Sequence, residues 1–183
     1  MTALFRTLGR DDRVRYALLG AGLLFLVVAV GAFALSASGS VPDPIPFDQT
    51  TATGIGGEPR QEIRDRGLHI PRAQVFYSQY QFIVGYRGVG HAVDQFQQPG
   101  HEQQFGYPIA VYVSDFAGTE PTLTEEGYID TETEPGWVDA ESATFVVGSE
   151  VSVPGGDSAV PFGSRSAAES FAESHGGELY DWA

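Results

Sequence analysis

The 183-residue chain carries 24 acidic residues against 10 basic ones, a net charge of −14. Such a surface repels nucleic acid and gains nothing from an anionic membrane surface, so nucleic-acid binding is excluded as a function. Cysteine is absent, which excludes disulfides, thiolate metal sites and cysteine nucleophiles. We attribute the acidic excess to halophilic adaptation, in which a dense carboxylate surface keeps the protein hydrated, in preference to an acidic binding face.

The first predicted element is a membrane-spanning helix over residues 16–37. These 22 residues carry no charge, and as a helix they extend roughly 33 Å, enough to cross a hydrocarbon core of about 30 Å. Arginines precede this segment, and the next one after it is Arg60. The positive-inside rule therefore places residues 1–15 in the cytoplasm and the rest of the chain outside it, at the cell membrane. A cleaved signal peptide is the alternative, because Ala32-Phe33-Ala34 fits a small-residue cleavage site.

Residues 38–67 are predicted to form a stalk. Prolines alternate with other residues at its start, and threonines and glycines follow. Proline and glycine at this density block regular strand pairing, and the few apolar residues are insufficient for a core. A short polar helix over residues 58–67 is the most regular structure expected here.

Residues 68–183 are expected to form one extracytoplasmic domain. Its first half predicts a strand hairpin, a short helix stopped by Pro99-Gly100 and a half-buried strand, over residues 73–77, 81–86, 90–98 and 109–116. A long acidic loop is expected over residues 118–135. The second half repeats this order of strand, strand, helix and strand, over residues 143–148, 159–162, 164–175 and 178–182.

The two predicted helices share a local pattern. Both contain Ala-x-acid-x-Phe, beginning at Ala92 and at Ala167, which places each Phe one turn after the Ala and facing the sheet. The shared pattern and element order predict an α+β fold of two ββαβ pseudo-repeats. Aromatic residues concentrate in the first repeat, where we expect them to fill a small core; an aromatic face that docks a partner is the alternative.

The four histidines are the remaining soft-to-borderline metal ligands. His91 lies near the start of the first predicted helix, His101 lies just past its stop, and Glu102 follows directly. Two imidazoles and a carboxylate could hold copper(II) or zinc. The alternative is a pair of solvent-exposed histidines in a loop. His175 is expected to complement the dipole of the last helix, and His69 has no evident partner.

Signals of catalysis are missing from the sequence. No Gly-x-Ser-x-Gly elbow supports a hydrolase triad. Residues 87–90, Arg-Gly-Val-Gly, lack the lysine and the further glycine of a phosphate-binding loop and predict a tight strand-to-helix turn. We therefore predict that the chain is not an enzyme.

The segment from Gly136 to Trp182 contains a series of motifs: Trp137-Val138-Asp139-Ala140, the strand 143–148, Val160-Pro161-Phe162, and Phe171 followed by His175-Gly176-Gly177. With these motifs the segment resembles the NosL family of nitrous-oxide-reductase accessory proteins. Residues 73–75 and 112–116 agree more loosely. The resemblance implies two small ββαβ units, a membrane-attached extracytoplasmic location, and delivery of copper(I) during maturation of nitrous oxide reductase.

The chain departs from the family pattern in its ligands. The family has Cys-Gly-Met ahead of the first strand and a methionine in the second-half turn, where this chain has residues 63–68 and 153–157 without either. Its only methionine is Met1. The resemblance thus implies a copper accessory protein whose partner is nitrous oxide reductase, another copper enzyme or an assembly factor. The alternative is a metal-free interaction module on the same scaffold.

Overall fold

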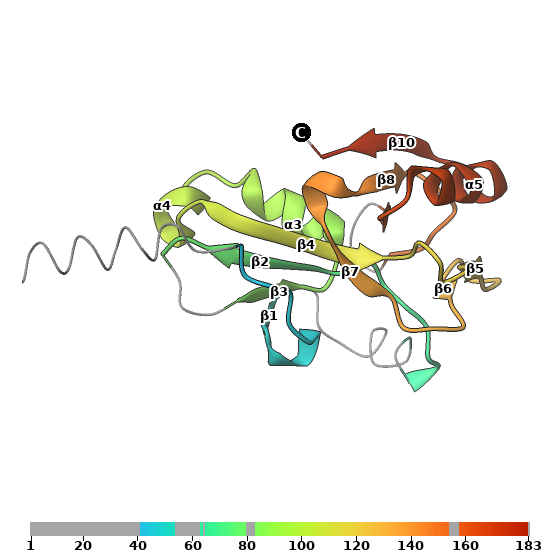
Figure 1. Ribbon diagram of the computed structural model, residues 1–183, viewed down its shortest axis with the longest axis horizontal. Coiled ribbons are helices and arrows are strands. Elements are labelled where there is room, and N and C mark those ends of the chain that lie inside the picture. The colour runs from blue at the N-terminus through green and yellow to red at the C-terminus, as the bar shows by residue number, and fades with distance from the viewer. Residues whose placement is uncertain (1–40, 54–62, 64, 80–82, 154–157, 183) are drawn as a thin grey trace, which may run out of the picture. The chain divides into compact units, whose positions relative to one another are not determined.

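The computed structural model describes residues 41–53, 63, 65–79, 83–153 and 158–182 (Figure 1). The predicted membrane helix at residues 16–37 lies outside these residues. Within the described part of the chain, no helix has the length and apolarity needed to span a membrane. Residues 42–183 form one compact unit.

The described chain folds into helices and strands of an α+β fold, as predicted. The strands are β1 (Thr51–Thr53), β2 (Ala73–Tyr77), β3 (Val84–Tyr86), β4 (Pro108–Asp115), β5 (Thr122–Leu123), β6 (Ile129–Asp130), β7 (Gly136–Asp139), β8 (Thr144–Val147), β9 (Ala159–Phe162) and β10 (Glu178–Asp181). The helices are α3 (Val89–Phe96), α4 (His101–Phe105) and α5 (Arg165–His175), with short 3₁₀ turns η1 (Phe47–Gln49) and η2 (Ala140–Ser142).

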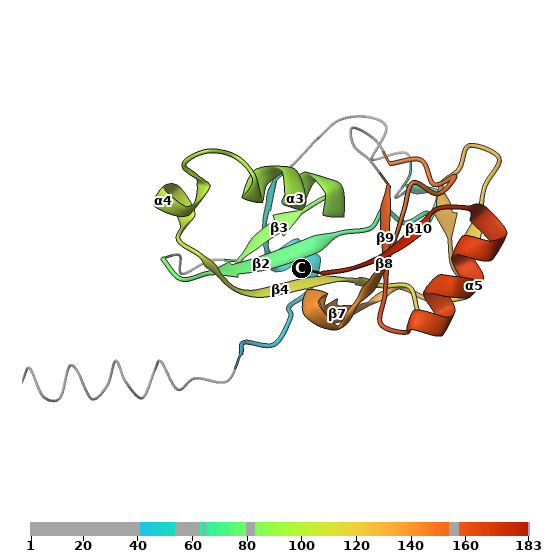
Figure 2. The same cartoon turned by 90° about the horizontal axis from the view of Figure 1, so that it is seen from above.

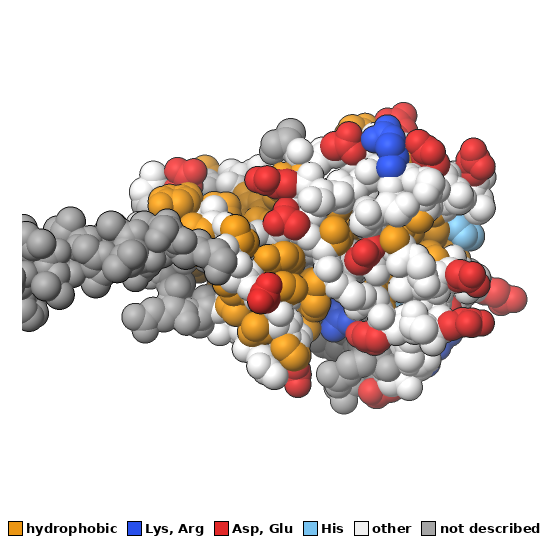
Figure 3. Space-filling view, in the orientation of Figure 1, with side chains coloured by type: hydrophobic (Ala, Val, Ile, Leu, Met, Phe, Trp, Pro, Cys, Tyr) orange, Lys and Arg blue, Asp and Glu red, His pale blue; other side chains and the backbone are white. Residues whose placement is uncertain are grey.

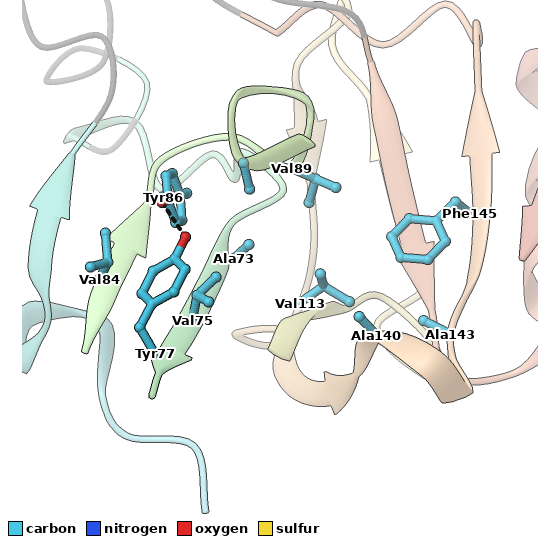
Figure 4. Close-up of a cluster of buried hydrophobic side chains, with 11 residues drawn as sticks. Ala73, Val75, Tyr77, Val84, Tyr86, Val89, Val113, Ala140, Ala143 and Phe145 are labelled. Atoms are coloured by element: carbon cyan, nitrogen blue, oxygen red, sulfur yellow. Dashed lines mark hydrogen bonds between the residues drawn. The ribbon is translucent and has the colours of Figure 1, made fainter. Parts of the chain in front are cut away.

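The larger sheet has the strand order β1-β3-β2-β4-β7. The predicted hairpin is confirmed, because β2 and β3 pair antiparallel, and β4 pairs antiparallel with the other edge of β2. Alternate residues of β2 point into one cluster, where Ala73, Val75 and Tyr77 are buried (Figure 4). Helix α3 covers this face through Val89 and Ala92, which are three residues apart (Figure 2).

The smaller sheet has the order β10-β8-β9, and α5 packs on it. Ala168 and Phe171 of α5 are buried in a second cluster with β8 and β9. Each half of the domain therefore has its first strand in the centre, flanked by the strand before the helix and the strand after it. This arrangement agrees with the predicted ββαβ order. The paired phenylalanines Phe96 and Phe171 both pack on their clusters, as the shared pattern predicted.

The structure differs from the predicted elements at three places. The predicted acidic loop over residues 118–135 contains a small hairpin, β5–β6. Strand β7 was not predicted, and it joins the larger sheet beside β4. The predicted helix over residues 90–98 ends at Phe96, and a separate helix, α4, follows after Gly100, which has a left-handed backbone with φ 88°. The four residues of β7 have little periodicity of their own, and β7 forms a strand because it pairs with β4.

The first part of the predicted stalk belongs to the folded domain. Strand β1 pairs parallel with β3, so the expectation that residues 38–67 lack strand pairing is wrong for Thr51–Thr53. Phe47 stacks on Trp137, with ring centroids 6.3 Å apart. The side chain of Gln74, fully buried, hydrogen-bonds both backbone groups of Ile45. The larger sheet thus supplies the partners that this proline-rich segment lacks within itself.

Candidate functional site

A chain of three buried polar side chains crosses the core beside the larger sheet. The Tyr77 hydroxyl lies 2.9 Å from Nε2 of His101. It also lies 2.7 Å from the Tyr86 hydroxyl (Figure 4). The two tyrosines come from the paired strands β2 and β3, and His101 begins α4. Only 6% of the His101 surface is exposed, and 2% of each tyrosine. The hydrogen bonds among these three side chains satisfy polar groups that burial has removed from water.

Aromatic rings enclose the imidazole of His101. Phe105 stacks on it with centroids 4.8 Å apart, and Phe96 approaches edge-on at 5.7 Å. Phe96 in turn contacts Trp182 at 6.1 Å. Phe96 and Phe105 come from α3 and α4, and Trp182 packs behind Phe96 without a ring contact to His101.

Burial keeps these groups uncharged. Desolvation lowers the pKa of His101, against a smaller opposite effect of the Glu102 carboxylate. Burial and the Tyr86 hydroxyl raise the pKa of Tyr77, and burial raises that of Tyr86. A neutral imidazole carries one N–H and one lone pair, so Nε2 either donates to Tyr77 or accepts from it, depending on the tautomer. The trio therefore resists both protonation and deprotonation near neutral pH.

The structure brings the predicted histidines to the same pair of tyrosines from different helices. His91, on α3 and half-buried, contacts the Tyr86 ring at 5.9 Å, while His101 contacts Tyr77. Glu102 points to the exposed surface. In the described part of the chain, no group of three histidine or carboxylate side chains is arranged to hold a metal ion. Ligation by His91, His101 and Glu102 thus stays a prediction, and the structure adds Tyr77 and Tyr86 to their surroundings.

His69 has partners that the sequence did not indicate. Its Nδ1 lies 3.7 Å from Oε2 of Glu134, whose Oε1 accepts a 2.8 Å hydrogen bond from Arg72. Burial lowers the pKa of His69, more strongly than Glu134 raises it. A guanidinium on the shared carboxylate disfavours a second cation, so this cluster is an ion pair rather than a metal site. Glu134 is 65 residues away along the chain, and no local pattern could reveal the pairing.

Two further predicted features take simple structural roles. Gly88 is the residue before α3, and the predicted tight strand-to-helix turn over residues 87–90 is confirmed by β3 ending at Tyr86 and α3 beginning at Val89. His175 is the last residue of α5, as predicted, and its ring packs on Phe171 at 4.7 Å. Its complementing of the helix dipole stays a prediction.

The chain is similar to solved structures that include two NosL proteins. The copper chaperone NosL from Shewanella denitrificans, solved by crystallography, is 20% identical with a TM-score of 0.47, covering 63% of this chain and 78% of that one. The apo-NosL protein from Achromobacter cycloclastes, solved by NMR in solution, is 25% identical with a TM-score of 0.42, covering 60% and 80% respectively. A search of curated proteins gave no match.

The family comparison covers the whole folded part that follows the predicted stalk. The family model NosL matches residues 68–183, which include both ββαβ units and the buried His101–Tyr77–Tyr86 chain. This match agrees with the prediction of a protein that is not an enzyme. Because the match spans more than half of its length, the chain belongs to the NosL family.

Proposed function

We propose that this protein is a membrane-anchored accessory protein, outside the cytoplasm, that binds or passes copper during maturation of a copper enzyme. Nitrous oxide reductase is the first client to test. The observation that carries the proposal is the NosL match over residues 68–183, because the family resemblance implies copper delivery. The charge-free segment at residues 16–37, with arginines on one side, supports the anchor.

Copper binding in this chain would depend on nitrogen ligands. The domain has neither cysteine nor methionine, since Met1 precedes the predicted anchor. Imidazole is an accepted copper ligand, and His91 and His101 are the histidines that share a neighbourhood. A metal on Nε2 of His101 would displace the Tyr77 hydroxyl, which lies 2.9 Å away. Losing that buried hydrogen bond costs about 1–3 kcal/mol, so we expect weaker copper binding than sulfur ligands would give.

A second candidate is a metal-free interaction module on the same scaffold. The observation that favours it is that the imidazole of His101 already has partners. Its Nε2 is hydrogen-bonded to Tyr77, and its ring packs against Phe105 and Phe96. In this role the buried trio is purely structural, and the protein acts by contact with an assembly partner.

A copper(I) competition titration separates the two candidates. The full-length chain in detergent and high salt would be titrated beside His91→Ala, His101→Phe and the double variant. His101→Phe keeps the aromatic packing, and His175→Ala, at the end of helix α5, is the control. One-to-one binding that disappears in the double variant and survives in the control supports the copper role. Binding no tighter than that of scattered surface carboxylates in every chain would reject it in favour of the metal-free module.

A further inference from the structure

The beginning of β4 and the residue before it present an exposed apolar surface. Tyr107 is 63% exposed and Ile109 is 48% exposed. Phe76 pairs with Ala110, next to Ile109, and meets the half-buried Tyr112 edge-on at 6.0 Å. We call these four residues, Phe76, Tyr107, Ile109 and Tyr112, the β4 patch. Figure 3 shows hydrophobic side chains gathered over this part of the domain.

The patch lacks the usual protection of a sheet margin. Strand β7 pairs only with Tyr112–Asp115, so among the described strands the first half of β4 has a partner on one side only. Exposed strand margins are normally guarded by charged side chains or covered. No charged residue occurs between Phe105 and Ser114, although the chain carries a net charge of −14. Carboxylates approach the patch at its Tyr112 end, where burial and, to a smaller extent, Asp139 and Asp43 raise the pKa of Tyr112. The uncharged stretch with Tyr107 and Ile109 on so acidic a protein indicates a surface that is covered in use.

Covalent connection brings this patch close to the predicted anchor. The backbone carbonyl of Pro42 accepts a 2.9 Å hydrogen bond from the Tyr112 hydroxyl, a member of the patch. Only five peptide steps separate Pro42 from Ala37, the end of the charge-free segment, and they span at most roughly 18 Å. Along β4, Ile109 is three residues from Tyr112, about 10 Å away. The docked residues 42–53 thus replace a long stalk by a very short one.

The short connection restricts where the domain can be. The polar layer on one side of a bilayer is about 5–8 Å thick. A domain of this length has a radius of gyration of about 14 Å, comparable to the full reach of the connection. If residues 16–37 span the membrane, this connection keeps Pro42, and with it the Tyr112 end of the patch, within roughly 18 Å of the end of the spanning segment, so the patch can reach the membrane surface.

The geometry points to the β4 patch contacting the lipid surface of the membrane that residues 16–37 are predicted to cross, on its extracytoplasmic side. An amphipathic ring such as that of Tyr107 is favoured at the level of the lipid headgroups, and an apolar side chain such as that of Ile109 is favoured toward the acyl chains. Contact is apolar, which suits a patch without basic residues. This inference rests on the anchoring part of the proposed function and is independent of copper.

The absence of native cysteine permits a direct test. Tyr107→Cys and Ile109→Cys would each carry one polarity-sensitive fluorophore in the full-length chain, reconstituted in phosphatidylcholine vesicles containing nitroxide-labelled lipid. Tyr180→Cys is the matched control, because Tyr180 is 52% exposed on β10 of the other sheet. We expect blue-shifted emission and several-fold stronger quenching by the labelled lipid at positions 107 and 109 than at position 180.

Vesicle flotation separates the two ways of failing. A chain that does not float with the vesicles lacks the anchor, and the anchoring part of the proposed function fails together with this inference. A chain that floats but shows equal, weak quenching at all three positions has a domain that stands clear of the membrane, which overturns the inference alone. Blue-shifted emission without lipid quenching also overturns it, because a second copy or another protein then covers the patch.

Discussion

The side-chain amide of Gln74 makes hydrogen bonds with both the N–H and the carbonyl of Ile45. Its Oε1 accepts a hydrogen bond from the Ile45 N–H at 3.0 Å, and its Nε2 donates to the Ile45 carbonyl at 3.1 Å. A single side chain therefore takes the place of a neighbouring strand for this residue. Because Gln74 is fully buried in β2, the N-terminal segment is attached to the centre of the larger sheet.

Replacing Gln74 should release this segment. In Gln74→Leu both backbone groups of Ile45 lose their partner, and we expect the free energy of unfolding to fall by about 1–3 kcal/mol. Amide hydrogen exchange over residues 45–53 should become faster, while α5 stays protected. Gln74→Glu is the comparison, since a carboxylate can still accept from the Ile45 N–H but cannot donate to its carbonyl. Unchanged exchange in Gln74→Leu would show that the two bonds do not hold the segment.

Gly85 leaves the space into which Thr50 fits. A Cβ at position 85 would overlap the Thr50 hydroxyl and crowd the ring of Phe47. Gly85→Ala should therefore displace β1 and lower the free energy of unfolding by about 1–3 kcal/mol, as overpacking does. Gly136→Ala is the matched control, because it is also a strand glycine but its added Cβ would meet open space. Thermal unfolding that ranks the two variants equally would contradict this role of Gly85.

His101 should make stability depend on pH. Its pKa is lower in the folded chain than the ordinary value of 6.5, because of burial. As the pH falls below 6.5 the unfolded chain takes up a proton that the folded chain resists, so stability is complete above that pH and declines toward the folded-state pKa. Denaturant unfolding between pH 5 and 8 should show that the free energy of unfolding declines less steeply with falling pH in His101→Phe than in wild type. At pH 8 the variant should be about as stable as wild type, apart from the loss of the hydrogen bond to Tyr77.

A second histidine provides the comparison for this pH dependence. Burial also lowers the pKa of His69, so its contribution has the same sign. His69→Gln should remove a separate part of the decline, and the double variant should be flatter than either single one. If His101→Phe keeps the full wild-type slope, the imidazole is not held neutral by the fold.

Asp115 connects the two sheets. Its Oδ1 accepts from the backbone N–H of Gly163 at 2.7 Å and from that of Ala117 at 2.8 Å. Asp115→Ala should lower the free energy of unfolding by about 1.5–3 kcal/mol, because bonds to a charged acceptor are lost. Asp115→Asn keeps an acceptor oxygen and should lose less. Equal losses in the two variants, measured by denaturant unfolding, would show that charge rather than hydrogen bonding is what matters here.

Sequence alone determined the local elements and the order in which they repeat. Strand alternation in residues 73–77 and the helix from 164 to the Gly176-Gly177 stop depend on neighbouring residues, and hydrophobic periodicity records them directly. The family resemblance likewise followed from motifs within the second half. For the candidate site, the residues His91 and His101 were found because imidazole is chemically distinctive.

Only the tertiary structure decided what these elements contact. Ile45 meets Gln74 across 29 residues, and Asp115 meets Gly163 across 48. The partners of His101 are similarly remote, since Tyr77 precedes it by 24 residues. Such hydrogen bonds follow from the packing of strands and helices, because burial removes polar groups from water and leaves only distant side chains to satisfy them. Periodicity carries no record of that pairing, so a proline-rich stretch predicted as a stalk became part of the sheet.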